Sequence, residues 1–351
     1  MARAARARRV EPKLDKQLVL NRFICAEFGF ADMREMLEDF YVTIQERDDS
    51  FEGEYHPFIK RFFTREGCKI DTSDLQGYGH NIRLHSERLG LGPNDGRQWK
   101  PHQYLALLFM ERYLDLWFAD RDDLKDRLNA YRASDGLLAD LPDYQTDELS
   151  TLAFQSATGS GKTLIMHAHI LQYQHYSQHY GKRFNNIYLV TPDADMSAQH
   201  LRELQASGIA GGLFDKNLSS IGQQAGFVQI IDIHKIADES GVLTIDVRAL
   251  GVQNLVLVDE GHLGQGGKEF SIWRRRRAQL ATDGFTIEYS ATFNQIATGA
   301  LLTHYSKCLL FDYAYRHFYD DGYGKDHNIA NLPAGLQDQN NRTWLTGCLL
   351  T

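Results

Sequence analysis

The eight residues Ser156–Thr163, Ser-Ala-Thr-Gly-Ser-Gly-Lys-Thr, are the stretch of this chain whose types and spacing most clearly indicate chemistry. Gly159 and Gly161 can adopt backbone angles that other residues avoid, so successive N–H groups can converge on an anion at the positive end of the next helix. Lys162 would then reach the β- and γ-phosphates of a nucleotide, and the hydroxyl of Thr163 would hold Mg²⁺. The pattern predicts a nucleoside triphosphate site, although serine replaces glycine at its first position. The predicted nucleotide contacts are Thr158, Gly159, Ser160, Gly161, Lys162 and Thr163.

Two adjacent acids form the second candidate site. The segment Asp259–His262, Asp-Glu-Gly-His, follows the apolar run Leu255–Val258. A buried strand that ends in paired acids brings two carboxylates to one crevice, where they can do different jobs. We expect Asp259 to complete the Mg²⁺ site with Thr163 and Glu260 to orient and deprotonate the attacking water. An exposed acidic turn is the alternative interpretation.

The elements that must position these residues are predicted by an alternation of two kinds of segment. Short apolar segments are separated by longer amphipathic ones from Leu152 onward. Near-continuous apolar strands of this kind predict a parallel sheet covered by helices on both faces, with ligands at the carboxyl ends of the strands. The expected strands are Leu152–Phe154, Ile187–Val190, Val228–Ile231, Leu255–Val258, Thr286–Tyr289 and Cys308–Phe311.

The segment before these strands predicts helices rather than chemistry. Apolar residues recur at helical spacing from Leu14 to Arg88, and a strongly apolar helix is expected over 104–118. The glycine-punctuated segment Gly77–Gly96 predicts a loop and a domain boundary.

Composition restricts the class of protein further. The chain has 351 residues and a net charge of −8, which excludes a globally basic nucleic-acid surface but leaves room for a local basic groove. Its four cysteines are far apart and lack CxxC spacing, which disfavours a zinc site or a disulfide scaffold. No apolar run approaches the roughly 18 residues of a membrane span, so we expect a cytoplasmic protein without membrane contact.

A third motif, Tyr289–Thr292 or Tyr-Ser-Ala-Thr, ends another expected strand, and with it the chain resembles the DEAD/DEAH-like superfamily 2 helicases. Within that superfamily, Ala157–Thr163, Asp259–His262 and Phe285–Phe293 look most like the helicase (restriction) subunit of type III restriction enzymes. The resemblance covers roughly residues 100–312. It implies an α/β fold, a RecA-like doubly wound mostly parallel sheet of the P-loop NTPase class, after a mainly helical N-terminal region. It also implies ATP and Mg²⁺ as cofactors.

The resemblance suggests roles for further residues. In the family a Ser-Ala-Thr segment couples the nucleotide site to nucleic-acid movement, which makes Ser290 and Thr292 coupling candidates. His262 would relay between them and ATP, or would be a structural histidine. Gln103, which follows Pro101 and His102, resembles the glutamine that recognises adenine.

Nucleic-acid contacts are expected at two other strand ends. Thr191 and Gln199 resemble the helicase motif that touches the nucleic-acid backbone without reading sequence, and Lys235 is placed to neutralise a phosphate. The alternative at both places is that these are ordinary polar residues at the end of a strand, with no role in binding nucleic acid. The basic run Arg274–Arg277 would either contact nucleic acid or form solvated charges and salt bridges, since adjacent helical positions point in several directions.

Together these features predict the ATP-binding lobe of an ATP-dependent DNA helicase or translocase of restriction type, acting on double-stranded DNA. The alternatives are a nucleotide-dependent nucleic-acid-binding or regulatory module that does not translocate, and an RNA helicase lobe.

The residues after Thr292 lack the arginine-rich segment of a second lobe, so we expect weak hydrolysis by this chain alone. A second helicase lobe, or a methyltransferase or nuclease subunit, is the expected partner, and no nuclease motif is evident in the sequence. The expected organisation is a flexible basic terminus (1–13), a helical accessory region (14–96), the ATP-binding lobe (97–312) and a linker or start of a second lobe (313–351).

Overall fold

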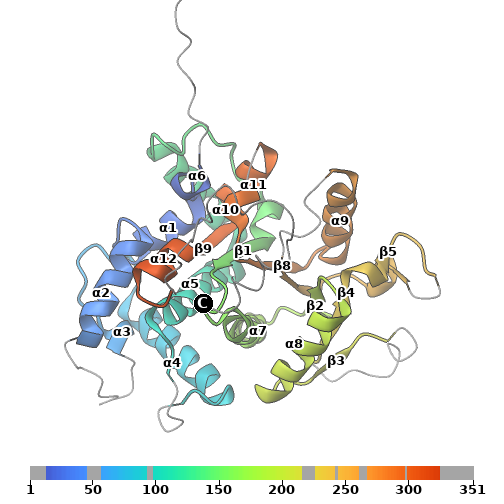
Figure 1. Cartoon of the computed structure of the whole chain (residues 1–351). Helices are drawn as coiled ribbons and strands as arrows, with labels where there is room; N and C mark the ends of the chain where they lie inside the picture. The colour runs from blue at the N-terminus through green and yellow to red at the C-terminus, as the bar shows by residue number, and fades with distance from the viewer. Residues whose placement is uncertain are drawn as a thin grey trace, which may run out of the picture. The chain divides into compact units, whose positions relative to one another are not determined.

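The computed structural model describes residues 13–45, 57–92, 98–215, 226–241, 244–260, 267–296 and 299–324 (Figure 1). The chain divides into two compact units, one ending at Tyr315 and one beginning at Arg316. The second unit is described only as far as Gly324 and holds most of helix α12 (Tyr315–Asp320). Over the described ranges, no helix combines the length and the apolar character needed to cross a membrane.

The first unit is built around a seven-stranded parallel sheet in the order β3-β4-β2-β7-β8-β1-β9. All six strands expected from the sequence are present, and the parallel sheet is confirmed. The sequence did not indicate the three-residue edge strand β3 or the separate two-residue strands β5 (Ile236–Ala237) and β6 (Ile245–Asp246). The strands of the large sheet are β1 (Thr151–Ser156), β2 (Ile187–Thr191), β3 (Gly211–Leu213), β4 (Val228–Asp232), β7 (Leu255–Asp259), β8 (Phe285–Ser290) and β9 (Leu309–Tyr313).

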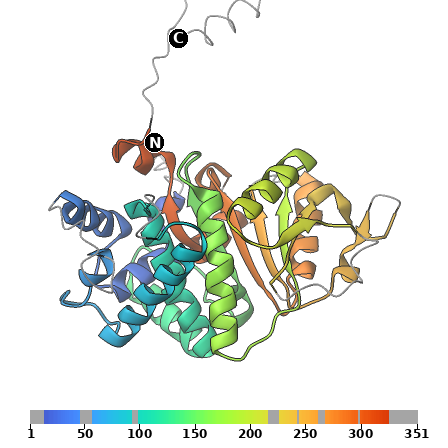
Figure 2. The same ribbon diagram turned by 90° about the horizontal axis from the view of Figure 1, so that it is seen from below.

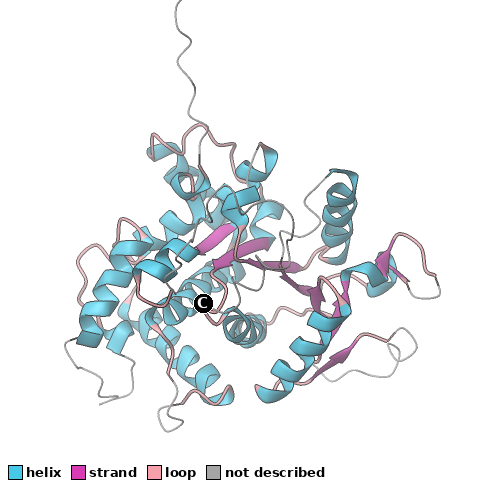
Figure 3. Ribbon diagram, in the orientation of Figure 1, coloured by secondary structure: helices cyan, strands magenta, loops and turns pink. Residues whose placement is uncertain are grey.

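Helices cover both faces of the sheet, as Figures 1 and 3 show. Alternation along β1 separates the faces, because Phe154 packs against His169 of α7 whereas Ala153 packs with Tyr305 of α11. One face carries α5 (Pro101–Ala119), α7 (Lys162–His179) and α8 (Ala194–Ala206), and the other carries α9 (Gly267–Leu280), α10 (Phe293–Ile296) and α11 (Ala300–Cys308). The doubly wound α/β class predicted from the sequence is therefore confirmed.

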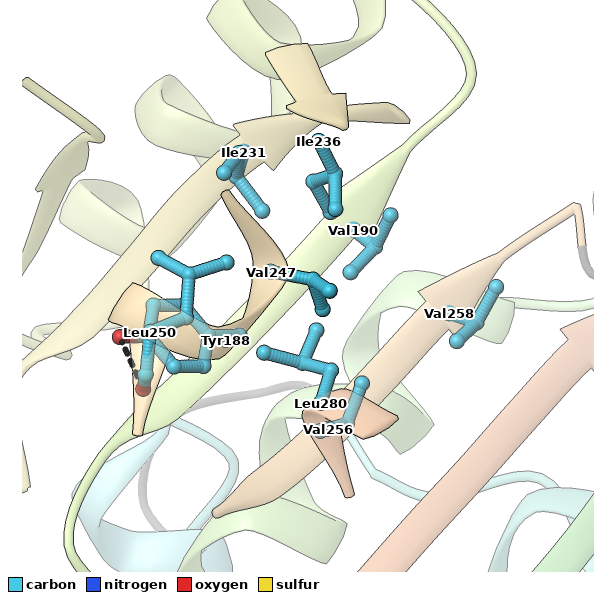
Figure 4. Close-up of a cluster of buried hydrophobic side chains, with 9 residues drawn as sticks. All are labelled: Tyr188, Val190, Ile231, Ile236, Val247, Leu250, Val256, Val258 and Leu280. Atoms are coloured by element: carbon cyan, nitrogen blue, oxygen red, sulfur yellow. Dashed lines mark hydrogen bonds between the residues drawn. The ribbon is translucent and has the colours of Figure 1, made fainter. Parts of the chain in front are cut away.

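A hydrophobic cluster on the α9 face fixes the register of β7 (Figure 4). Side chains from β2, β4 and β7 converge there with Leu280 of α9 and with the short helix η4 (Val247–Leu250). Each fully buried aliphatic side chain contributes about 1.5–3 kcal/mol. Because Val256 and Val258 point into this cluster, strand alternation turns Asp259 to the opposite face, toward α7 and α8. The cluster comprises Tyr188, Val190, Ile231, Ile236, Val247, Leu250, Val256, Val258 and Leu280.

The N-terminal region is mainly helical, as predicted, and packs around α5 and the β9 end of the sheet (Figure 2). Helix α1 covers β9, and Asn21 Nδ2 donates a hydrogen bond to Leu310 O at 2.9 Å. This contact satisfies a carbonyl on an edge strand, whose unpaired groups would otherwise invite pairing with another chain. The helical elements are η1 (Leu14–Lys16), α1 (Val19–Glu27), α2 (Met33–Gln45), α3 (Pro57–Lys60), α4 (Thr72–Arg88), α6 (Arg121–Ser134) and η2 (Thr146–Ser150).

The loop predicted over Gly77–Gly96 is wrong in its first half, because α4 continues to Arg88. A glycine inside a helix costs roughly 1 kcal/mol relative to alanine. Packing outweighs that cost here, since Tyr78 and Ile82 are buried on the inner face of α4. Residues 93–97 of the predicted loop lie outside the described residues.

A buried carboxyl group, Glu111 on α5, joins the N-terminal helices to α7. Its oxygens accept hydrogen bonds from Asn81 Nδ2 of α4 (3.0 Å), and from Gln172 Nε2 (2.6 Å) and Tyr176 Oη (2.8 Å) of α7. Burial raises the pKa of Glu111 to about 7, although the three donors act in the opposite direction. The folded protein therefore holds a proton on this group over a pH range in which the unfolded chain has lost it.

We predict that Glu111→Gln flattens the dependence of stability on pH. Between the ordinary pKa of 4.5 and the folded value of about 7, the folded state binds more protons, so wild-type stability falls as pH rises. At about 1.4 kcal/mol per unit, the loss is on the order of 3 kcal/mol. Urea unfolding at several pH values should show the wild-type and Glu111→Gln curves diverging over this window. The control Glu87→Gln removes a half-exposed acid on α4 and should run parallel to wild type.

Candidate functional site

The phosphate loop lies between β1, which ends at Ser156, and α7, which begins at Lys162. Gly159 and Gly161 have φ values of 82° and 91°, in the left-handed region that favours glycine. Within the described ranges, no side chain caps the N-terminus of α7, so its first N–H groups are available to an anion. Ser160 Oγ is buried and has no hydrogen-bond partner within the described part of the chain. Thr158 is exposed at the mouth of the loop, and Lys162 and Thr163 are partly exposed.

Two neighbouring elements hold this loop in shape. Ala157 N donates to Tyr313 O of β9 at 2.9 Å. At the start of α5, Gln103 Nε2 donates to Ser160 O at 2.8 Å, and His102 Nε2 lies 3.1 Å from the same oxygen. The ring of His102 is fully buried and stacks on Tyr313, with 4.2 Å between centroids. The loop is therefore held from α5 and β9 together.

Gln103, the predicted adenine-recognising residue, lies against the loop. Its Oε1 accepts from Lys100 N at 2.9 Å, so both ends of the amide have partners in this structure. A Cβ atom on Gly161 would stand 2.3 Å from Gln103 Nε2, so a larger residue there would displace the Gln103 amide from the loop. His102 was not singled out from the sequence, and the only signal for it was its place beside Gln103.

The paired acids meet the lysine of the phosphate loop. Lys162 Nζ lies 2.8 Å from Asp259 Oδ1 and also forms an ion pair with Glu260. Burial opposes the charge of Lys162, but the two carboxylates raise its pKa above the ordinary value. Burial likewise opposes the charge of Asp259, but a hydrogen bond with His200 and the charge of Lys162 lower its pKa to about 2. Both groups are therefore ionised at neutral pH.

Glu260 adopts a left-handed backbone conformation directly after Asp259. Glu260 has a φ of 52°, and its N–H donates to Asp259 Oδ1 at 3.0 Å. This turn ends β7 and directs successive side chains differently, so that Asp259 is 1% exposed whereas Glu260 is 25% exposed. The buried acid and the more accessible one thus have the different environments that their predicted roles require.

The structure adds a residue that the sequence did not indicate, His200 on α8. Its Nε2 lies 2.8 Å from Asp259 Oδ2, and both side chains are 1% exposed. The available signal was the spacing of Ser197, His200 and Leu204, which form the buried face of α8. Such a position is more often filled by a core residue than by a partner of a functional acid.

The third motif lies beside the first two in the sheet. In the parallel register Ser290 is opposite Gln155 of β1, and Tyr289 is opposite Asp259 of β7. Ser290 Oγ accepts a hydrogen bond from Thr292 N at 3.1 Å. His262, the other coupling candidate, lies outside the described residues.

The three nucleic-acid candidates lie at or beyond the carboxyl ends of β2 and β4. Thr191 is buried, and its hydroxyl contacts Asp193 O (3.1 Å) and Ser197 Oγ (2.5 Å) at the start of α8. Gln199 Nε2 donates to Glu203 Oε1 at 2.8 Å on the exposed side of that helix. Lys235 is exposed at the end of η3 (Ile233–Lys235).

The basic run on α9 is largely engaged in ion pairs. Arg275 and Arg276 bind Asp238 at 2.7 Å and 3.1 Å, and Arg277 binds the buried Glu288 of β8 at 2.7 Å. Burial opposes the charge of Arg277, but Glu288 raises its pKa. The salt-bridge interpretation thus holds for these three arginines, and the side chain of Arg274 lies outside the described residues.

A parallel sheet that carries a phosphate loop after β1 and paired acids after β7 defines a P-loop NTPase with a RecA-like fold. In comparison with known proteins, residues 121–295 match the model described as "Type III restriction enzyme, res subunit". This segment, just under half of the chain, is similar to that family over its DEAD/DEAH-like helicase domain. The match includes the phosphate loop, the paired acids and the Ser-Ala-Thr segment, but not α5 or β9. A comparison with curated proteins found no match.

We predict that Gly161→Ala weakens nucleotide binding by at least about tenfold. The added Cβ meets Gln103, and a left-handed conformation costs a residue other than glycine roughly 1–3 kcal/mol. Titration with a fluorescent ATP analogue should measure the loss. The control Gly77→Ala adds a Cβ to a helix with nothing within 4 Å, so it should leave binding unchanged and raise stability by about 0.5–1 kcal/mol. Equal nucleotide affinities of Gly161→Ala and wild type would contradict the role of this loop.

Proposed function

We propose that this chain binds Mg²⁺·ATP at the carboxyl edge of its sheet and is the ATP-binding lobe of a motor that moves on double-stranded DNA. The observation that carries the proposal is the meeting of Lys162 with Asp259 and Glu260 beside the N-terminus of α7, which no described side chain caps. The same edge holds Ser290 of the Ser-Ala-Thr segment. The helicase domain of the matched family supports nucleic acid as the track.

The residues at this edge fit a bound nucleotide and Mg²⁺. Thr163 and Asp259 offer a hydroxyl and an ionised carboxylate, the hard oxygen donors that Mg²⁺ prefers. Ser160 Oγ is buried and has no partner among the residues that the structure describes, so it is a further polar group for the phosphates. When bound, Mg²⁺ would neutralise phosphate charge and align the γ-phosphoryl group.

The protein's own side chains then have distinct roles. Lys162 exchanges its carboxylate partners for β- and γ-phosphate oxygens, together with the backbone of residues 158–161. This exchange takes the lysine away from Glu260, whose carboxylate would then orient the attacking water and accept its proton. Gln103 would recognise the adenine edge from its place against the loop.

Nucleic acid is proposed to bind along the strand ends beyond β2 and β4. Lys235 would neutralise a phosphate, and Gln199 would contact the backbone from the exposed side of α8. Thr191 would support this contact by fixing the first turn of α8 through Ser197. Ser290 and Thr292, together with His262, would couple these contacts to the nucleotide.

Efficient turnover is proposed to need a partner that supplies arginines, either a second helicase lobe or another subunit of a restriction system, such as a methyltransferase or nuclease. In phosphoryl transfer, an arginine that stabilises the transition state increases the rate by about 10³–10⁵. We therefore expect the 351-residue chain alone to bind Mg²⁺·ATP but to hydrolyse it slowly.

We predict that Glu260→Gln retains ATP binding and lowers the hydrolysis rate by at least about 10²-fold, because a general base contributes roughly 10²–10⁴. Single-turnover hydrolysis with labelled ATP, measured beside equilibrium binding, separates the two effects. Lys162→Ala provides the contrast, since it should lose binding itself. Hydrolysis at the wild-type rate in Glu260→Gln would remove Glu260 from this role.

We predict that Lys235→Ala reduces the salt dependence of DNA binding. Loss of one phosphate contact should lower the slope of log K against log salt by about 0.9. Fluorescence anisotropy with a labelled duplex at several salt concentrations measures that slope. The control Lys125→Ala removes a lysine paired with Asp122 next to η2, at the opposite ends of the strands, and should keep the wild-type slope. An unchanged slope in Lys235→Ala would place the phosphate contact elsewhere.

A further inference from the structure

His200 stands out among the buried polar groups because its direct partner is a functional acid. We propose that His200 is a positioning residue, which holds the Asp259 carboxylate in the orientation that binds the metal ion and links it to α8. The inference rests on the function proposed above, since it assumes that Asp259 helps to bind Mg²⁺.

The two oxygens of Asp259 have separate partners. Oδ1 is 2.8 Å from Lys162 Nζ and accepts from Glu260 N, so it faces the phosphate loop. Oδ2 is 2.8 Å from His200 Nε2 and faces α8. An ionised carboxylate has no hydrogen to donate, so Nε2 must carry the hydrogen of this bond.

A partner of this kind is needed because the last torsion of an aspartate is soft. Rotation about that bond has broad, roughly two-fold minima, so the backbone does not fix the plane of the carboxylate. His200 fixes it with a donor that is itself 1% exposed and enclosed between α8 and β7. Groups that hold a metal ligand in this way typically change metal affinity about 10-fold to 100-fold when removed.

The other side of the imidazole lies near Glu203, which is on the same helix. His200 Nδ1 has no hydrogen-bond partner among the described residues, and Glu203 Oε2 lies 3.8 Å from it. Glu203 Oε1 in turn accepts from Gln199, the proposed nucleic-acid contact. The donor that holds Asp259 and the proposed DNA contact Gln199 are therefore carried by the same helix, so a shift of α8 would move the donor at Asp259.

The test compares two amide variants of similar polarity, with wild type as reference. The amide nitrogen of His200→Gln can occupy the place of Nε2, whereas the shorter side chain of His200→Asn leaves Asp259 Oδ2 without its donor. Binding of a fluorescent ATP analogue is measured across a Mg²⁺ titration and in EDTA. We expect His200→Asn to need about tenfold more Mg²⁺ for half-maximal binding, with unchanged affinity in EDTA, and His200→Gln to stay within about twofold of wild type.

A matched control separates positioning from a general effect of losing a buried histidine. His167 of α7 is also buried at the α7–α8 contact, but its Nδ1 faces Ser207 Oγ at 2.8 Å rather than Asp259. His167→Asn should lose stability in thermal unfolding while keeping the wild-type Mg²⁺ dependence. The inference is overturned if His200→Asn shows the wild-type Mg²⁺ dependence, or if His167→Asn shows the same shift. A wild-type chain whose nucleotide binding ignores Mg²⁺ would instead overturn the proposed function, and this role with it.

Discussion

Burial of the Asp259 carboxylate is the constraint on which the carboxyl edge of the sheet depends. An ionised carboxylate that is only 1% exposed costs several kcal/mol unless charges and donors surround it. Three groups do so, each on a different element: Lys162 at the start of α7, the N–H of Glu260 in the turn after β7, and His200 on α8. The phosphate-loop helix, the central strand and the helix after β2 are thereby held to one point.

The rest of the fold delivers these elements in register. The hydrophobic cluster on the α9 face determines which way β7 side chains alternate, and so directs Asp259 away from it, toward α7 and α8. On the other side of the phosphate loop, α5 and β9 hold the backbone through Ser160 O and Ala157 N. The backbone of the phosphate loop, where a nucleotide would bind, is thus fixed from both sides.

Sequence predicted what depends on local pattern. The glycine-rich motif indicated Lys162, and an apolar strand followed at once by acids indicated Asp259 and Glu260, because each signal lies within a few residues. The apolar runs likewise indicated the strands themselves. Contacts between distant segments left no such signal. His102 and His200 meet partners 58 and 59 positions away in the chain, and Glu111 draws donors from two other helices. The loop predicted from Gly77 was wrong for a related reason. Tertiary packing of α4 outweighed the local tendency of glycine to end a helix.

The attachment of α5 to the phosphate loop affects how this lobe could be excised for study. The family match begins at Arg121, at the start of α6, and so excludes all of α5. A fragment cut at that boundary would keep the whole Ser156–Thr163 motif. It would lose His102 and Gln103, the two side chains that contact Ser160 O. It would also uncover the apolar inner side of α7, which packs against α5 in the intact chain. The smallest piece that preserves the architecture of the nucleotide site is therefore larger than the piece that carries its motifs.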